Sequence, residues 1–116
     1  MVNFFVYEGK FEGNSISDIW GGWKSKKIKV KSIKLSDFIK KEQINKIHLL
    51  KIDCEGAEYG IIKSLSKEDY KKVKNIILEY HKGKSDEIEN TLKENNFKVF
   101  KKITGKGTGI FFAKKD

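Results

Sequence analysis

Two continuous apolar runs organise the chain, at residues 47–52 and 73–80. Short apolar runs rich in Ile, Leu and Val are typical of buried strands. Between them, Ala57, Ile61, Ile62 and Leu65 recur at helical spacing. Two buried strands separated by helical segments predict a parallel α/β unit.

The N-terminal part predicts β structure followed by a short helix. Residues 2–7 are aromatic and β-branched, which is typical of a strand. Residues 27–33 alternate Lys with apolar side chains, and this alternation predicts a strand with one face in water. Ser36 is a predicted N-cap for a helix that carries Phe38 and Ile39.

Two further helices are predicted from their capping residues. Ser66, followed three residues later by Asp69, resembles a capping box. Ser85 is a predicted N-cap for a helix whose buried face carries Ile88 and Leu92. The pair Asn95-Asn96 ends that helix in the prediction.

The C-terminal residues predict an antiparallel hairpin. Residues 97–103 and 110–113 have strand character, and a glycine-rich segment joins them. Gly105, Gly107 and Gly109 could be taken for a phosphate-binding loop. That loop leads from a strand into a helix, whereas a strand follows here, so a hairpin turn is the better interpretation.

Acidic side chains and a histidine follow the two apolar runs. Asp53 and Glu55 come directly after the first run, and Glu58 would lie in the first turn of the next helix. Glu79 and His81 end the second run. Open α/β sheets bind ligands beyond the carboxyl ends of their strands, so we expect a functional site there. Neighbouring carboxylates raise one another's pKa, which suits a general base or a cation site.

Structural roles remain open for the same residues. Glu58 could cap its helix, because a carboxylate interacts favourably with a helix N-terminus. Asp53 and Glu55 could simply form a turn, and His81 could be an exposed side chain beside Lys82.

His48 and Cys54 are predicted to be packed residues. His48 lies within an apolar stretch, and Cys54 lies between two acids that would raise its thiol pKa. Neither has a metal-ligand spacing with His81.

The net charge is +9 at pH 7, and every cationic side chain apart from histidine is a lysine. A basic chain can bind nucleic acid, and Trp20 and Trp23 could stack on bases. However, the lysines are spread over both halves, and arginine, which reads phosphate and guanine best, is absent. Nucleic-acid binding is therefore the least favoured interpretation.

The chain is expected to be cytoplasmic. No apolar run approaches the ~18 residues of a membrane span. The N-terminus lacks the basic and apolar regions of a signal peptide. The single cysteine fits a reducing compartment.

Three stretches resemble the FkbM-type methyltransferases. The central one, LLKIDCEGAE at residues 49–58, matches the LLKID-x-EG-AE signature of that family. SIKLSDF at residues 32–38 and IILEYH at residues 76–81 add weaker matches. The resemblance covers about residues 32–113 and corresponds to the C-terminal half of the family's domain.

The resemblance implies a fold and an order of strands. These proteins are similar to other class I methyltransferases, whose seven strands are ordered 3-2-1-4-5-7-6 with strand seven antiparallel. The runs 47–52 and 73–80 would be strands four and five, and the hairpin would supply six and seven. The predicted fold class is therefore α/β, a partial Rossmann-like sheet in the order 4-5-7-6, with helices packed on it and N-terminal β segments.

The resemblance also implies transfer of a methyl group from S-adenosylmethionine to an oxygen of a small-molecule or glycan acceptor. In that interpretation Asp53 or Glu55 accepts the hydroxyl proton or orients the acceptor. Glu79 and His81 line the pocket. The cofactor-binding residues are not identifiable, because the family's glycine-rich turn and second-strand acid would precede residue 1.

We therefore expect a single truncated domain, with N-terminal β segments at residues 1–34 and an α/β core at residues 35–116. Without a strand-one neighbour, the run from Ile47 to Ile52 would be an exposed apolar edge, and such edges are usually paired or covered. The predicted partner is the N-terminal β structure, with 27–33 as one candidate, or a second chain. The alternative function is a non-catalytic remnant that dimerises or binds a partner through this edge.

Overall fold

The structure is a computed structural model. It describes the backbone of residues 2–7, 25–81 and 83–116, and the side chains of these residues from residue 31 onward. They are called the described residues below. Trp20 and Trp23 lie outside them, so the stacking role considered for these side chains stays a prediction.

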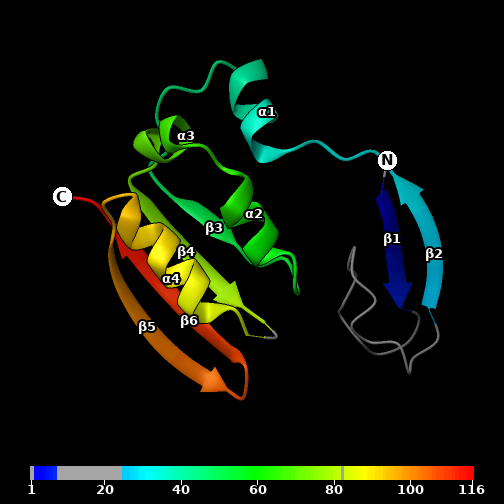
Figure 1. Ribbon diagram of the computed structural model, residues 1–116. Coiled ribbons are helices and arrows are strands. Elements are labelled where there is room, and N and C mark those ends of the chain that lie inside the picture. Colours follow the sequence, from blue (N-terminus) through cyan, green and yellow to red (C-terminus); the bar gives the residue numbers. More distant parts are fainter. Residues whose placement is uncertain (1, 8–24, 82) are drawn as a thin grey trace.

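The core is a four-stranded mixed sheet in the order β3-β4-β6-β5 (Figure 1). The strands are β3 (Leu50–Ile52), β4 (Asn75–Tyr80), β5 (Lys98–Gly105) and β6 (Thr108–Lys114). β3 and β4 are parallel, and β6 runs antiparallel to both β4 and β5. This arrangement confirms the predicted α/β class and the 4-5-7-6 order with an antiparallel last strand.

β3 is shorter than the predicted strand over residues 47–52. Before β3, Ile47 forms an isolated parallel bridge with Val73, which precedes β4. Continuous pairing with β4 begins only at Leu50. In between, the carbonyl of His48 accepts a hydrogen bond from the Asn75 side chain at 2.8 Å. A side-chain amide thus replaces a ladder contact and interrupts the strand.

Four helices accompany the sheet: α1 (Leu35–Lys41), α2 (Glu58–Ser64), α3 (Lys67–Lys72) and α4 (Ser85–Glu94). Figure 1 shows α2 and α4 lying across one face of the sheet. The pattern of β4 explains why the helices cover one face, because its side chains alternate between buried and half-buried. Ile76 and Leu78 are fully buried beneath the helices, whereas Ile77 faces the other side.

The core lies between that sheet face and the helices. Tyr80 packs on Phe111 with ring centroids 5.1 Å apart, and Tyr70 meets Phe97 edge-on at 6.2 Å. The other buried apolar residues are Ile39, Ile52, Ile62, Leu65, Val73, Ile76, Leu78, Ile88, Leu92 and Ala113. Ile88 and Leu92 form the buried face of α4, as predicted.

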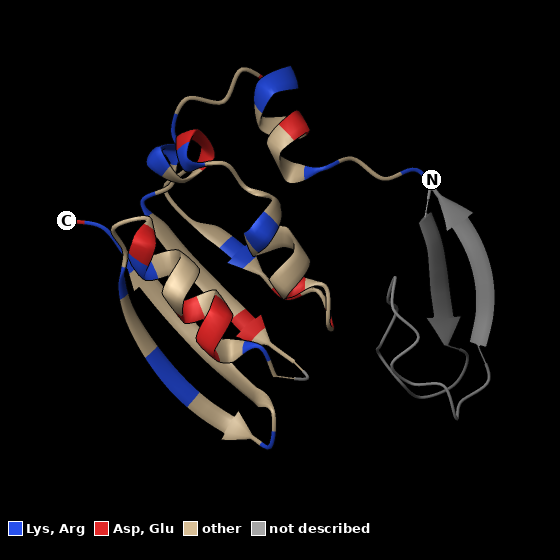
Figure 2. Ribbon diagram, viewed as in Figure 1, with Lys and Arg blue, Asp and Glu red and all other residues tan. Residues whose placement is uncertain are grey.

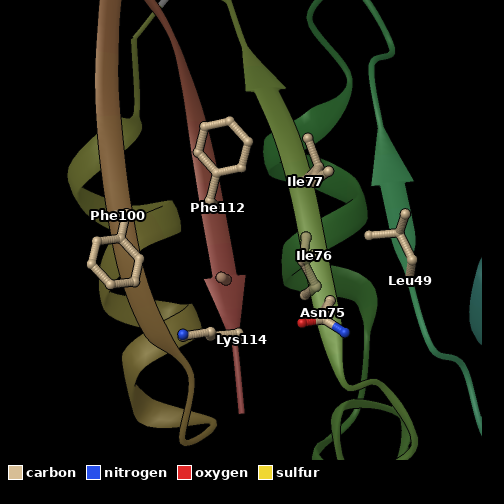
Figure 3. Close-up of a pocket in the computed structure, with 8 residues that line it drawn as sticks. Leu49, Asn75, Ile76, Ile77, Phe100, Phe112 and Lys114 are labelled. Atoms are coloured by element: carbon tan, nitrogen blue, oxygen red, sulfur yellow. The ribbon is translucent and has the colours of Figure 1, made fainter. Parts of the chain in front are cut away.

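The opposite face of the sheet is open, with the helices behind it in the view of Figure 3. Phe100 and Phe112 are 58% and 43% exposed, and they neighbour each other on β5 and β6. Together with Leu49 and Ile77 they line a shallow hollow of about 360 Å³. The described residues therefore leave an apolar surface on this face.

The helix caps were predicted correctly in one of three cases. Ser66 and Asp69 form the capping box of α3. Ser36, predicted as an N-cap, lies inside α1, and its hydroxyl donates to Asp69 at 2.6 Å. Ser85, also predicted as an N-cap, is the first residue of α4, which begins after Lys84 in a left-handed conformation. In both cases, the helix starts one or two residues earlier than the serine suggests.

β1 (Val2–Tyr7) and β2 (Ser25–Val30) pair antiparallel with each other in a separate two-stranded sheet. The prediction that this N-terminal β structure covers the edge of residues 47–52 is therefore wrong. Within the described residues, β4 is the only strand neighbour of β3.

None of the helices in the described part of the chain is long and apolar enough to cross a membrane.

Candidate functional site

The parallel register of β3 and β4 brings the predicted site residues to one edge of the sheet. Ile52 lies opposite Leu78, so Asp53, which follows β3, and Glu79, the next residue in β4, lie side by side. Carboxyl ends of parallel strands meet at the same edge, which is where α/β sheets bind ligands. Figure 2 shows acidic segments at the end of β4 and in the loop that leads into α2.

Asp53, Glu79 and His81 converge at this edge. One side-chain ligand atom from each residue lies within 4.8 Å of the other two. Asp53 is exposed, whereas Glu79 and His81 are half-buried. Glu79 alternates with the buried Leu78 and Tyr80, so its carboxylate faces away from the helix layer.

A tight turn adds Glu55 to the same group. Glu55 and Gly56 both have left-handed backbone angles, with φ of 49° and 113°. Glycine adopts such angles freely, but a glutamate there carries a steric penalty of about 1–2 kcal/mol. The turn directs the Glu55 carboxylate toward His81, with 3.6 Å between its oxygen and Nε2. Strained residues of this kind often occur at functional sites.

Glu58 is the member of the group whose role the sequence left open. Its side chain is only 2% exposed, and its two oxygens accept hydrogen bonds from the Gly56 amide at 3.0 and 3.1 Å. One of these oxygens also lies 2.7 Å from Nδ1 of His81. Glu58 is in the first turn of α2, as predicted, but α2 has no side-chain cap hydrogen bond. Its carboxylate instead stabilises the turn before the helix and holds the imidazole. These five residues, Asp53, Glu55, Glu58, Glu79 and His81, are called the acidic cluster below.

A sequence signal for Glu58 was available. Glu58, Ile62 and Leu65 are spaced four and three residues apart, so they share one helix face. The structure buries all three. A glutamate on an apolar helix face must find a polar partner, because an unpaired buried charge is strongly unfavourable. That partner is His81, which follows β4 and not the same helix. The helix pattern could therefore predict that Glu58 needs a polar partner, but not which residue supplies it.

His81 is held between acids on both ring nitrogens. An ionised carboxylate only accepts hydrogen bonds, so Nδ1 carries the proton shared with Glu58. Nε2 faces Glu55 at 3.6 Å and Glu79 at 3.8 Å. Burial of the ring lowers the pKa of His81, but the Glu58 hydrogen bond and the three negative charges outweigh it. The net pKa lies above the ordinary value.

The two other candidate side chains lie outside this group. His48 is exposed, so its prediction as a packed residue is wrong, since the ladder breaks at that position. Cys54 is half-buried against the core, as predicted. Burial raises its thiol pKa, and the charges of Glu58 and Asp53 raise it further, so it is a poor nucleophile.

A small hollow adjoins the buried side of the cluster. Its volume is about 210 Å³, and Glu58 and His81 form part of its wall. Tyr59 and Lys84 form another part, with the Lys84 ammonium 4.2 Å from the centre of the Tyr59 ring. The site therefore offers negative charge, one imidazole and an aromatic surface within a short distance.

The glycine-rich segment is a hairpin turn, as predicted. β5 and β6 pair up to Gly105 and Thr108, and Gly107 between them has a φ of 73°. No helix follows, so the segment is not a phosphate-binding loop of the strand-to-helix kind.

Comparison with known protein families decides the assignment. The sequence model of the methyltransferase FkbM domain matches residues 3–99 of the 116-residue chain. The chain belongs to this family. The match includes the acidic cluster and extends further toward the N-terminus than the stretches quoted above. No match was found among curated proteins or among solved structures.

Proposed function

We propose that the acidic cluster is the acceptor site of an FkbM-type O-methyltransferase domain. The observation that carries the proposal is the convergence of Asp53, Glu55, Glu79 and His81 at the carboxyl edge of β3 and β4. Family membership supplies the reaction class, and the edge position is where ligands bind in sheets of this type.

Methyl transfer to a hydroxyl group requires two things of these side chains. An acceptor hydroxyl must be oriented, and its proton must leave as the new carbon–oxygen bond forms. Asp53 or Glu55 would take that proton or orient the hydroxyl. Glu79 and His81 would line the pocket, and the charged imidazole could donate a hydrogen bond from Nε2 to the acceptor. General-base assistance of this kind typically contributes 10²–10⁴-fold to a rate.

The methyl donor in the proposal is S-adenosylmethionine. The described residues do not complete a pocket for it, because the side of β3 where the class I fold places strand one has no strand partner among them. The Gly56 amide, in the turn between β3 and α2, already donates to Glu58, so this amide is not free to bind the cofactor. Full activity would therefore need a cofactor-binding element from another chain or from a longer natural protein.

The family resemblance implies a small-molecule or glycan acceptor, and the hollow beside Glu58 and His81 is compatible with one ring or one sugar unit of it. This hollow is smaller than the ~300–1,000 Å³ of typical ligand pockets. Asp53, Glu55 and Glu79 are not part of its wall, so the acceptor hydroxyl would have to reach past His81 to these carboxylates. Tyr59 could support that ring on its aromatic face. A cytoplasmic setting would fit the single free cysteine.

Calorimetry with S-adenosylmethionine and with its demethylated product tests the proposal, at high protein concentration. Binding of either would show that the chain holds the methyl donor without a partner. Transfer of a labelled methyl group to a panel of hydroxyl compounds would then be expected to fall in Asp53→Asn and Glu79→Gln, but not in Asp37→Asn. The absence of both binding heat and methyl transfer, also in mixtures with a cofactor-binding half of a related domain, would contradict the enzymatic role.

A second candidate function is partner binding through the free edge of β3. Ile33, Phe38 and Leu49 lie near this edge and are 54%, 41% and 54% exposed. Ile33 and Phe38 line a hollow of about 430 Å³ together with Leu50 and Ile52 of β3. Exposed strand edges beside apolar surface readily pair with another chain. We infer that a second copy or a complementing chain would add a strand here.

Light scattering after size-exclusion chromatography separates the two functions. A dimer that dissociates in Phe38→Glu, but persists in the equally polar change Ile103→Glu on β5, would place the interface beside the free edge of β3. A monomer at every concentration would remove the reason for this second function.

A further inference from the structure

The acidic cluster has the composition of a metal site. Asp53 contributes a carboxylate from the end of β3, and Glu79 and His81 contribute a carboxylate and an imidazole from the end of β4. Two oxygens and one nitrogen, each from a side chain that faces the same point, form a donor set used by divalent transition metals. We propose that Asp53, Glu79 and His81 bind a divalent cation.

The distances fit an ion after a small adjustment. The three ligand atoms lie within 4.8 Å of one another. Two tetrahedral ligands at ~2.0–2.2 Å from one ion are about 3.3–3.6 Å apart. The ligand atoms would therefore move toward one another by about 1.5 Å at most. Asp53 is exposed and the Glu79 side chain is 43% exposed, so both can rotate inward without disturbing the core.

The contact between His81 and Glu58 is a second feature typical of metal sites. Metal-bound histidines usually donate their other ring N–H to a carboxylate or carbonyl, which fixes the tautomer and the ring orientation. Here Nδ1 lies 2.7 Å from the carboxylate of Glu58, which is 2% exposed and is itself held by the Gly56 amide. Nε2 is left facing the exposed carboxylates.

The charge balance of the cluster favours a cation. Four carboxylates surround one imidazole in a chain of net charge +9. Among the described residues, the ion pairs of Glu55, Glu58 and Glu79 all involve His81. One imidazolium cannot neutralise four acids. A bound divalent ion would relieve the remaining repulsion, and Glu55, 3.6 Å from Nε2, could become a fourth ligand.

The donor set also narrows the choice of ion. Imidazole suits Mn²⁺, Fe²⁺ and Zn²⁺ better than Ca²⁺, which takes oxygen ligands almost exclusively. Three protein ligands leave coordination positions open for water or for a substrate oxygen. The ion would replace the proton on Nε2 of His81, so in the metal-bound site this nitrogen would no longer donate a hydrogen bond to the acceptor. If the proposed methyl transfer holds, the ion would instead lower the pKa of the acceptor hydroxyl. Binding of the ion does not depend on that reaction.

Metal titration of the complete, chelator-stripped chain tests the proposal without any methyl donor. As Mn²⁺ is added, the electron paramagnetic resonance signal of the free ion should stay low until one ion is bound per chain, and should then rise. Asp53→Asn and Glu79→Gln should each weaken binding at least tenfold. Glu58→Gln, which changes only the outer contact of His81, should weaken it about 10–100-fold. Asp37→Asn and Glu68→Gln, which change exposed acids on α1 and α3, should leave binding unchanged.

Nuclear magnetic resonance locates the ion. Mn²⁺ should broaden the amide signals around residues 53, 79 and 81, and spare those around residue 68. Circular dichroism of each variant shows whether it is folded, and the exposed Asp53 should tolerate its change. Equal Mn²⁺ and Zn²⁺ affinity in the native chain and in the Asp53→Asn, Glu79→Gln double variant would overturn the proposal. Equal weakening by Asp37→Asn would overturn it as well.

Discussion

The Glu58 carboxylate lies 2.7 Å from Nδ1 of His81, and the two residues are 23 positions apart in the chain. The contact joins the first turn of α2 to the end of β4, across the edge where the acids converge. It therefore does two things at once. It satisfies a glutamate buried in the helix layer, and it fixes the orientation of the one imidazole in the acidic cluster.

Glu58→Gln should lower the pKa of His81, measured by nuclear magnetic resonance titration in the presence of a chelator. Burial lowers that pKa, whereas the Glu58 hydrogen bond and the charges of Glu58, Glu55 and Glu79 raise it above 6.5. The substitution removes the negative charge of Glu58 and leaves only a neutral oxygen to accept from Nδ1, which is a weaker partner for the charged imidazole. Glu68→Gln changes a glutamate whose side chain is 76% exposed, and should leave the titration unchanged.

The same substitution should make stability less dependent on pH. A histidine whose pKa is raised on folding stabilises the native state below its unfolded pKa of about 6.5, and this contribution is lost as pH rises through the folded value. Urea unfolding should therefore show a larger loss for Glu58→Gln at pH 6 than at pH 9, with about 1.5–3 kcal/mol lost at the lower pH. An equal loss at both values would contradict a charged contact.

Gly109→Ala should destabilise the sheet, because the added methyl group would lie 2.4–2.6 Å from the Tyr80 side chain. Tyr80 and Gly109 face each other across β4 and β6, and the ring is buried over the glycine. Overpacking of this kind typically lowers stability by about 1–3 kcal/mol. Thermal unfolding measures the effect.

Gly60→Ala is the matched control. Gly60 lies in α2, and nothing is within 4 Å of the position its methyl group would take. Alanine is favoured over glycine in a helix by about 0.5–1 kcal/mol, so this variant should be more stable than the native chain. If the two glycine variants behaved alike, the close approach of Tyr80 to the backbone would be incorrect.

Asp69→Asn should reduce the acid sensitivity of folding. Burial works against ionisation of Asp69, but hydrogen bonds from Ser36 and Ser66 outweigh it and hold its pKa below 3.8. A lowered carboxyl pKa stabilises the native state above the unfolded pKa and loses this contribution as pH falls through the folded value. The variant should lose about 1–2 kcal/mol at pH 7 and be less affected between pH 4 and pH 2.

Asp86→Asn provides the comparison for Asp69, since Asp86 is an exposed acid in the first turn of α4. It should retain the acid sensitivity of the native chain. Parallel acid titrations of the two variants, followed by circular dichroism, would show no difference if Asp69 contributed nothing specific.

Leu92→Ala should lower the free energy of unfolding by about 2–5 kcal/mol, because it opens a cavity beneath α4 where the side chain is fully buried. Leu49→Ala makes the same chemical change at a side chain that is 54% exposed. It should have little effect at low protein concentration. A comparable loss in both would mean that β3 is covered in the folded state, as the partner-binding function requires.

Local patterns predicted most elements correctly but placed their ends less well. The aromatic and β-branched residues at 2–7 predicted β1, and the apolar run at 73–80 predicted β4 with two extra residues at its start, because such side chains favour strands. Helix starts at Ser36 and Ser85 were misplaced, since serine hydroxyls also find partners elsewhere. Ser36 donates to Asp69, a residue 33 positions away, which no local pattern can indicate.

The site shows the same division. Acids after two parallel strands had to meet at one edge, so Asp53, Glu55, Glu79 and His81 could be grouped from sequence spacing and the α/β pattern. The burial of Glu58 and the 2.7 Å contact to His81 depend on how α2 packs against β4.

The pattern of residues by itself determined the α/β class, the terminal hairpin and the acids that follow the apolar strands. The 4-5-7-6 strand order was implied by the family resemblance. Tertiary packing decided that β1 and β2 pair with each other, that β3 keeps a free edge, and that Glu58 holds His81. The reason is physical. Periodicity and composition act between neighbours in sequence, whereas an edge pairing or a buried ion pair depends on the free energy of segments that meet only after the chain has folded.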